Sequence, residues 1–273
     1  MYSPAGAGRG GIVGEERRRS ILLELGFGIR LDGGEMHGSG WITPEMHAPG
    51  TGRLRTSILA SWADYLAGRL AVEVMTPRVP VTLDLDVHLY RPAPGSGTVT
   101  GVCRVVKSGR SVFVAGIEFA DESGEPIGTA TGSFMVVPDP AIVMPPIPSA
   151  AAGLPPGEPL AVPFAERAGC ARRGPGVAVL QRSEEGINAS GTVGGGLIAL
   201  AVEEAFLSLE PGRTLSSLAL RYLQPVRIGP ATATAHVRHG LGHAELRDSG
   251  RDDRLCVTAT ARTFAGVPAA AGS

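Results

Sequence analysis

The sequence predicts an α+β fold made of two copies of one unit, each an antiparallel sheet wrapped around a central helix. Three observations lead to this prediction: the two halves share segments at a fixed spacing, each half contains one apolar segment of helical period, and alternating segments joined by Gly-containing turns follow it. The chain has 273 residues, a length that suits two domains of ordinary size.

A proline-rich segment divides the chain nearly in half. Residues 138–163 contain nine prolines, more than a helix or a central strand tolerates, so this segment is expected to be an extended linker. We therefore expect an N-terminal extension over residues 1–26, a first unit over 27–137, the linker over 138–159 and a second unit over 160–266.

Two strand-like segments carry the internal repeat. Residues 82–92 read TLDLDVHLYRP and residues 215–225 read LSSLALRYLQP, and one constant offset aligns them from end to end. The same offset places Gly109 of one predicted turn on Gly242 of another. Both halves then end on similar alternating segments, IGTATGSF and VTATARTF, so each half is one copy of the same unit.

An apolar segment of helical period precedes each of these strands. It covers residues 54–74 in the first half and 196–209 in the second. The first of these helices is apolar almost all round, so it needs burial on more than one side. A sheet curled around the helix supplies that burial, and this arrangement is the hotdog fold.

The first helix carries one acid on a side without other charges. On a helical wheel Asp64 points away from the large apolar side chains, and its neighbours are small. Such a helix suits close approach by another element, which would leave a groove with Asp64 on its floor, and partial burial would raise the pKa of the carboxylate. An ordinary exposed helix aspartate is the alternative. The small neighbours are Ser57, Ala60, Ser61, Ala67, Gly68 and Ala71.

The second helix begins with a glycine triplet, Gly194 to Gly196. The first N–H groups of a helix have no partner within the helix and lie at its positive end, so they can bind a developing oxyanion. Glycines at that place let a substrate approach the backbone. The alternative is that the triplet only makes a tight turn into the helix.

Charge and composition disfavour several other functions. The formal net charge is −1, which provides no long-range field to attract nucleic acid or an anionic membrane. No apolar run approaches the roughly 18 to 20 residues that cross a bilayer, and charges stand where a signal peptide needs its apolar core. We expect a cytoplasmic protein that binds neither nucleic acid nor membrane. Three irregularly spaced cysteines, Cys103, Cys170 and Cys256, are expected to be buried apolar side chains.

No metal site is expected. His236, His239 and His243 have a spacing that resembles metal ligands, but their segment has the pattern of a strand, a glycine turn and a second strand. This pattern predicts a surface hairpin.

The segment from Asn188 to Glu203 resembles the hallmark of the hotdog acyl-CoA thioesterases of the 4-hydroxybenzoyl-CoA and phenylacetate-pathway type. That hallmark reads N-x-x-G-x-x-H-G-G and is followed seven residues later by Asp or Glu. Gly194 occupies the position of the family histidine. The positions that follow the pattern are Asn188, Gly191, Gly195, Gly196 and Glu203.

The first half keeps only the acid of this hallmark, as Asp64. Its helix start has Thr56 and Ser57 at the two glycine positions, Arg55 at the histidine position and Pro49 at the asparagine position. The two halves therefore differ at the residues that the family uses for chemistry.

The resemblance implies that the two hotdogs pack as an internal pseudo-dimer, with the acid of one facing the helix start of the other. One composite site would then combine Asp64 with Asn188, Gly194 and Gly195, and the family comparison adds Thr82 as the residue that positions water. The other site would combine Glu203 with Pro49 and Arg55, with Leu215 at the Ser or Thr position. The residues typical of the family thus collect in a single site, with Gly196 in support.

The activity implied by the resemblance is hydrolysis of an acyl-CoA or a related acyl thioester. The Gly195 N–H would polarise the carbonyl, Asp64 would activate water or attack directly, and Asn188 and Thr82 would orient water or substrate. Arg55 is expected to meet the phosphates of coenzyme A, and His47 to border the pocket.

No cofactor is expected apart from coenzyme A as part of the substrate, and the family implies assembly of such pseudo-dimers into homo-oligomers. Two other functions stay open. One is an acyl-CoA or acyl-carrier binding module without catalysis. The other is a hotdog hydratase, whose D-x-x-x-x-H arrangement is not found at the helix start of either half.

Overall fold

The computed structural model describes residues 20–264, apart from positions 138, 140, 142, 145–148, 154, 156 and 189. Residues 1–19 of the expected N-terminal extension and several positions of the proline-rich linker therefore lie outside the described residues. In the described part of the chain, no helix is long and apolar enough to span a membrane.

Twelve strands of the described residues form one antiparallel sheet. The first half supplies β1 (Phe27–Asp32), β2 (Glu35–Trp41), β3 (Pro80–Leu89), β4 (Thr98–Ser108), β5 (Val112–Asp121) and β6 (Pro126–Val136). The second half supplies β7 (Cys170–Gly174), β8 (Val177–Leu180), β9 (Leu215–Tyr222), β10 (Ala231–Arg238), β11 (Leu241–Asp248) and β12 (Arg254–Thr263). The order is β1-β2-β4-β5-β6-β3-β9-β12-β11-β10-β8-β7, so the second half repeats the strand order of the first in reverse, outward from the β3–β9 pair.

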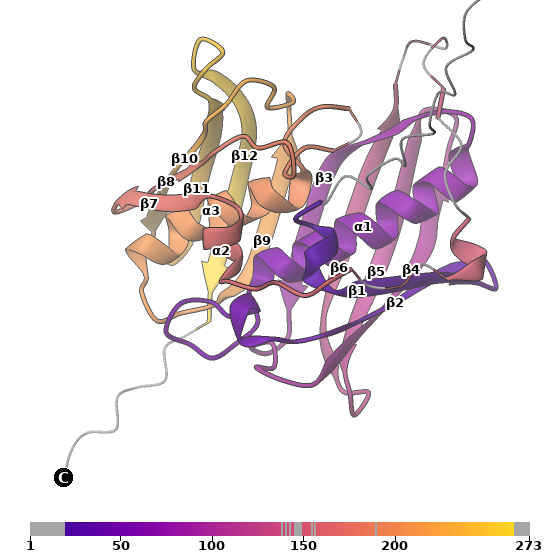
Figure 1. Ribbon diagram of the computed structural model, residues 1–273, viewed down its shortest axis with the longest axis horizontal. Coiled ribbons are helices and arrows are strands. Elements are labelled where there is room, and N and C mark those ends of the chain that lie inside the picture. Colours follow the sequence, from indigo (N-terminus) through magenta and orange to yellow (C-terminus); the bar gives the residue numbers. More distant parts are fainter. Residues whose placement is uncertain are drawn as a thin grey trace, which may run out of the picture.

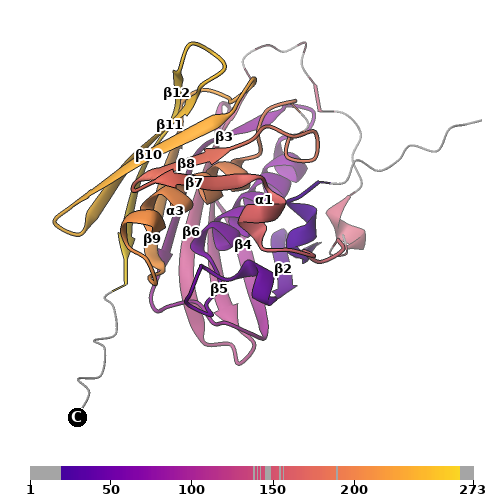
Figure 2. The same cartoon turned by 60° about the vertical axis from the view of Figure 1, so that its left-hand side comes forward.

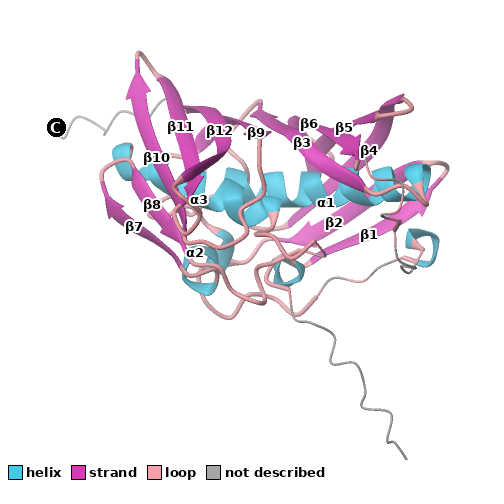
Figure 3. Cartoon of the chain, turned by 90° about the horizontal axis from the view of Figure 1, so that it is seen from above, coloured by secondary structure: helices cyan, strands magenta, loops and turns pink. Residues whose placement is uncertain are grey.

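Two long helices lie on the same face of this sheet (Figure 1). They are α1 (Thr56–Met75) and α3 (Gly195–Leu209), which confirms the two helices expected from the sequence. Figure 3 shows them nearly end to end, with the long strands on one side and β1, β2, β7 and β8 curling round the other. The remaining helical segments are short: η1 (Leu23–Leu25), η2 (Pro44–Met46), η3 (Ala150–Ala152) and α2 (Phe164–Arg167).

The curled sheet buries α1 on more than one side, as its composition predicts. Trp62 is 1% exposed, stacks on Phe27 of β1 with ring centroids 4.7 Å apart, and donates its indole N–H to the Leu25 carbonyl. Ile58 and Leu66 on the same helix are fully buried. Because apolar side chains around most of the helix are covered, each half is a closed core rather than a helix resting on a flat sheet.

The two halves join through β3 and β9, at the centre of the sheet (Figure 2). Asp86 lies opposite Ala219, the residue aligned with it in the repeat, and Leu85 and Val87 lie opposite Leu220 and Leu218. The pairing of β3 with β9 is therefore symmetric about the pair Asp86–Ala219, two residues that the repeat aligns. The fold is a tandem hotdog packed as an internal pseudo-dimer, as predicted.

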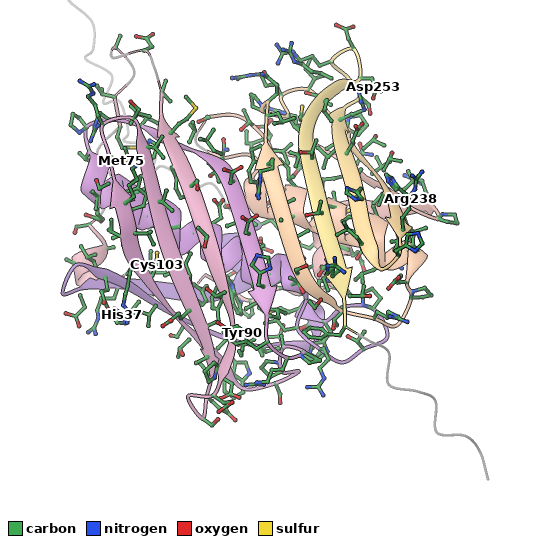
Figure 4. All side chains as sticks on the ribbon, turned by 180° about the vertical axis from the view of Figure 1, so that it is seen from behind. His37, Met75, Tyr90, Cys103, Arg238 and Asp253 are labelled. Atoms are coloured by element: carbon green, nitrogen blue, oxygen red, sulfur yellow. The ribbon has the colours of Figure 1, made fainter. Side chains whose placement is uncertain are left out.

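The outer face of the sheet points away from both helices (Figure 4). On this face His236 of β10 lies opposite His243 of β11, with their rings stacked, while His239 lies in the turn between the strands. The predicted hairpin is thus confirmed, and the described residues contain no group of three or more side chains that would hold a metal ion. All three cysteines are free and buried, as expected.

Candidate active site

Asp64 and Thr82 meet inside the first hotdog. Asp64 lies in the middle of α1, and Thr82 lies near the start of β3, which runs beside the helix. The Thr82 hydroxyl donates a hydrogen bond of 3.0 Å to Oδ1 of Asp64. One carboxylate oxygen is therefore held by the protein, and Oδ2 is left for another partner.

That second oxygen faces the start of α3 in the other hotdog. A Cβ placed on Gly195 would lie 3.0 Å from Oδ2 of Asp64, closer than ordinary van der Waals contact. The acid of the first half and the glycine triplet of the second half are thus neighbours, although Asp64 and Gly195 lie in different halves of the sequence. Only glycine allows the backbone of α3 to approach the carboxylate this closely without displacing it.

The Asp64 carboxylate binds its proton more tightly in the folded protein than an exposed aspartate does in water. Burial raises the pKa of the Asp64 carboxyl to about 6, and the hydrogen bond from Thr82 offsets part of this rise. Such a carboxylate is ionised at neutral pH and is a stronger base than an exposed aspartate. A raised pKa of this kind is common at catalytic sites.

The start of α3 offers free hydrogen-bond donors. Gly194 precedes the helix and donates its own N–H to the Gly186 carbonyl. Among the described residues, no protein group accepts a hydrogen bond from the N–H of Gly195 or Gly196. These donors lie at the positive end of a helix of 15 residues, which favours an anion or an oxyanion beside them.

Tyr222 completes this group of residues, and it was not expected from the sequence. Its hydroxyl donates to the Gly195 carbonyl at 3.2 Å and would lie 3.3 Å from a Cβ on Gly195. Burial raises the pKa of Tyr222 well above its ordinary value, and the nearby Asp64 charge adds to the effect. We refer to Asp64, Thr82, Gly195, Gly196 and Tyr222 as the open site.

Asn188 has different contacts from those expected. Its Oδ1 accepts hydrogen bonds from the backbone N–H of Ser190 and from both the N–H and the hydroxyl of Thr192. The residue is exposed, and its side-chain oxygen closes its own loop ahead of α3 rather than reaching the Asp64 carboxylate. The role of Asn188 in orienting water or substrate stays a prediction.

The equivalent position in the other half is filled. Glu203 of α3 is fully buried, and its carboxylate accepts the N–H of Thr56 at 2.9 Å, the N–H of Ser57 at 3.3 Å and the Ser57 hydroxyl at 2.6 Å. The Thr56 hydroxyl donates to the Leu215 carbonyl at 2.8 Å. The protein thus caps the start of α1 with its own acid, and we refer to Arg55, Thr56, Ser57 and Glu203 as the closed site.

Arg55 is part of this buried cluster and not a surface group. It is 2% exposed, and its guanidinium lies 3.2 Å from Glu203 and 2.6 Å from Glu204. Glu204 also pairs with Arg172 at 2.6 Å. The expected contact between Arg55 and the phosphates of coenzyme A is therefore corrected: two internal carboxylates hold the guanidinium, because burying an arginine requires paired charges.

His47 and Pro49 belong to the loop before α1. The His47 ring bonds the Gly95 carbonyl through Nε2 at 2.7 Å, and the backbone of His47 forms an isolated bridge with Leu54. Pro49 is exposed. The observed contacts of His47 fasten this loop, and its place at the border of a pocket stays a prediction.

The starts of α1 and α3 have the same backbone geometry although their side chains differ. Arg55 before α1 has φ −64° and ψ 142°, and Gly194 before α3 has φ −63° and ψ 142°. The alignment of the two copies therefore places equivalent residues at equivalent positions. What differs is the side chains: Thr56 and Ser57 in the closed site, Gly195 and Gly196 in the open site.

Comparison with known proteins supports this description. The model of the thioesterase superfamily matches residues 56–127, from the start of α1 to β6. Over this stretch the chain is similar to the thioesterase superfamily, within a tandem hotdog fold. These similarities support thioester hydrolysis as its general chemistry, and no curated protein is a significant sequence match.

Solved structures share the fold over most of the chain. An acyl-ACP thioesterase from Bacteroides thetaiotaomicron is 15% identical, with a TM-score of 0.61 and coverage of 85% of this chain and 98% of its own. The 12:0-ACP thioesterase of Umbellularia californica is 12% identical, with a TM-score of 0.62 and coverage of 86% and 98%. The tesB protein of Mycobacterium avium subs. paratuberculosis is 16% identical, with a TM-score of 0.59 and coverage of 90% and 98%. At these identities the likeness shows the tandem hotdog fold.

Proposed function

We propose that this protein hydrolyses an acyl-CoA, or a related acyl thioester, at one composite site between its two hotdogs. The observation that carries the proposal is the meeting of Asp64 from the first hotdog with the start of α3 from the second, 3.0 Å from the Cβ position of Gly195. A base and free N–H donors at one place are the two elements that hydrolysis of a thioester requires.

The N–H groups of Gly195 and Gly196 are the proposed oxyanion hole. As water adds to the carbonyl carbon, negative charge develops on the carbonyl oxygen, and donors fixed at a helix start need no reorganisation to stabilise it. Removing one such donor in other enzymes lowers kcat by about 10²- to 10³-fold. The closed site supports this assignment, because there the equivalent N–H of Thr56 already binds a carboxylate oxygen at 2.9 Å.

Asp64 is the proposed base or nucleophile. As a base, it removes a proton from water while the water oxygen bonds to the carbonyl carbon, and the C–S bond then breaks with its electron pair leaving on sulfur. As a nucleophile, it forms an anhydride that water hydrolyses afterwards. Thr82 serves both routes, since it holds Oδ1 and directs Oδ2 toward Gly195.

The substitution of glycine for the family histidine fits a site that relies on backbone donors. Gly194 offers no side chain, and it supports the site as the residue before α3. The chemistry proposed here uses only protein groups and water, with coenzyme A as the leaving part of the substrate. The closed site has its helix start occupied by Glu203, so we assign turnover to the open site alone.

The test is release of free thiol from short, medium, long and aromatic acyl-CoAs, with Asp64→Asn and Glu203→Gln as matched carboxamide variants. Loss of the base should lower kcat by about 10²- to 10⁴-fold in Asp64→Asn. The Glu203 variant should keep turnover close to native at a temperature where it is folded.

Equal losses in the two variants would contradict a single open site. If the native protein released no thiol while acyl-CoA raised its Tm, the chain would be an acyl-binding module and the hydrolytic proposal would fail.

A further inference from the structure

Tyr222 is the group at the open site that the proposed mechanism does not yet use. It lies at the end of β9 and is partly exposed. Its hydroxyl and Oδ2 of Asp64 both approach the Cβ position of Gly195, at 3.3 Å and 3.0 Å, so the two oxygens lie beside the same glycine at the start of α3. No hydrogen bond joins the two oxygens in the described structure: Thr82 donates to Oδ1 of Asp64, and the Tyr222 hydroxyl donates to the Gly195 carbonyl.

The hydroxyl is specific to the open site. The constant offset that superposes the two repeats places Leu89 at the equivalent position of the closed site, and Leu89 is apolar and 8% exposed. There Thr56 stands at the position of Gly195, and its hydroxyl donates to the Leu215 carbonyl at 2.8 Å. A tyrosine needed only for packing would not require a hydroxyl beside the free N–H groups at the start of α3.

The bond that Tyr222 makes is weak enough to be shared. Its acceptor is the Gly195 carbonyl at 3.2 Å, longer than the usual 2.7–2.8 Å of an O–H···O hydrogen bond. A hydroxyl has one proton and can turn toward a stronger acceptor. A sulfur that gains negative charge as the C–S bond breaks would be such an acceptor.

We propose that Tyr222 is a further catalytic residue of the open site, whose hydroxyl donates a hydrogen bond to the departing sulfur of the thioester. The inference rests on the hydrolytic function proposed above. In this step the C–S bond breaks, its electron pair passes to sulfur, and the Tyr222 proton stays on its oxygen while it stabilises the thiolate. The side-chain donor that Gly194 lacks is thus supplied from β9.

The chemistry requires a donor here and not an acid. A thiol such as a cysteine side chain has a pKa near 8.5, below the ordinary value of about 10 for tyrosine, so proton transfer from Tyr222 to the thiolate would be unfavourable. Burial and Asp64 raise the pKa of Tyr222 further, which keeps its proton in place throughout the working range of pH.

The experiment compares two leaving groups on one acyl chain. Native protein, Tyr222→Phe and the control Tyr65→Phe are assayed with the acyl-CoA that is hydrolysed fastest and with the 4-nitrothiophenol thioester of the same acid. Tyr65 is a suitable control because it is a second partly buried tyrosine, on α1, and also loses only its hydroxyl. Thermal melting of each variant verifies that the fold is retained.

Tyr222→Phe should lower kcat for the acyl-CoA by about 10- to 100-fold, as expected for a hydrogen bond to a charged group. The loss should fall below about 3-fold for the nitrothiophenol thioester, whose thiolate is a far weaker base and needs less stabilisation. Tyr65→Phe should match native protein on both substrates.

An equal loss on both substrates, or no loss on acyl-CoA, would overturn the assignment to the sulfur. Neither result would affect the proposed hydrolysis, which fails only if the native protein releases no thiol.

Discussion

Replacing Asp64 by asparagine should lower kcat by about 10²- to 10⁴-fold and at the same time stabilise the protein at alkaline pH. Burial raises the pKa of Asp64 from its ordinary 3.8 to about 6, so the folded state binds this proton more tightly than the unfolded state. The stabilising contribution of the protonated group is therefore complete below about pH 3.8 and is lost as the pH rises through about 6.

The magnitude follows from the size of the shift. Each pKa unit corresponds to about 1.4 kcal/mol, so the ionised carboxylate lowers the free energy of unfolding at pH 8 by about 3 kcal/mol. Asparagine keeps an oxygen for the Thr82 hydroxyl and does not ionise. In a chain of 273 residues, this difference should raise the Tm of Asp64→Asn by about 5 °C at pH 8 and by almost nothing at pH 4.

The assay is thermal melting of native protein and variant between pH 4 and pH 8, alongside the pH dependence of kcat/KM. Native kcat/KM should rise through about pH 6 and then level off, because the base acts when it is ionised. A variant that melts at or below the native temperature at pH 8 would refute the reasoning, since the carboxylate would then not be destabilised by burial.

Asp248 provides the control of opposite sign. It is buried, which raises its pKa, but the backbone N–H groups of Arg227, Ile228 and Gly229 donate to it at 2.7–3.1 Å and lower the pKa overall. Its contribution to stability is present above its ordinary pKa and is lost as the pH falls. Asp248→Asn should therefore destabilise the protein at pH 8 while Asp64→Asn stabilises it.

Three further substitutions test the two helix starts, and a fourth, Gly68→Ala in the middle of α1, is the control. Gly195→Ala adds a methyl group 3.0 Å from Oδ2 of Asp64 and should lower kcat by about 10-fold or more. In the control Gly68→Ala, the new methyl lies 3.7 Å from its nearest neighbour. This control should leave kcat unchanged and stabilise α1 by about 0.5–1 kcal/mol. Gly196→Ala forces its methyl against a serine hydroxyl of α1, closer than atoms pack, and should cost about 1–3 kcal/mol in urea unfolding. Glu203→Ala leaves a buried arginine without one of its partners and should cost about 3–5 kcal/mol in the same measurement, with turnover retained at low temperature. If Gly196→Ala and Glu203→Ala left the free energy of unfolding unchanged, the contacts at the two helix starts would not contribute to stability.

The fold could be predicted because its signals are local or repeated. The constant offset between the two halves reappears in the register of β3 and β9, where Asp86 lies opposite Ala219. The apolar character of α1 similarly required burial on more than one side. Of the candidate site, the approach of Asp64 to Gly195 is predicted by combining the repeat with the resemblance to the hotdog thioesterases, which implies that each acid faces the other helix start.

The remaining features depend on tertiary neighbours that no sequence pattern contains. Arg55 has the charge of a phosphate-binding residue, but its partners Glu203 and Glu204 come from the other half of the chain and bury it. Tyr222 aligns with Leu89 in the repeat and so belongs to no motif. The signal that could have indicated it is this difference itself: one copy has an aromatic hydroxyl at a strand end where the other has an apolar residue. For Asn188 the motif gives the residue type but not the loop that its side chain closes.

The two helix starts divide stability and chemistry between them. At the closed site Glu203 satisfies two helix N–H groups and pairs with Arg55, so its charge is hydrogen-bonded and paired. At the open site Asp64 has a side chain one methylene shorter and is held back by Thr82, so the helix N–H groups stay free and the carboxylate is poorly solvated. A carboxylate that capped α3 as Glu203 caps α1 would stabilise the fold and occupy the N–H groups that we propose as the oxyanion hole. The same difference that makes the open site less stable therefore leaves its helix N–H groups free for the proposed substrate, and a duplicated chain can accept this loss because its other half retains the cap.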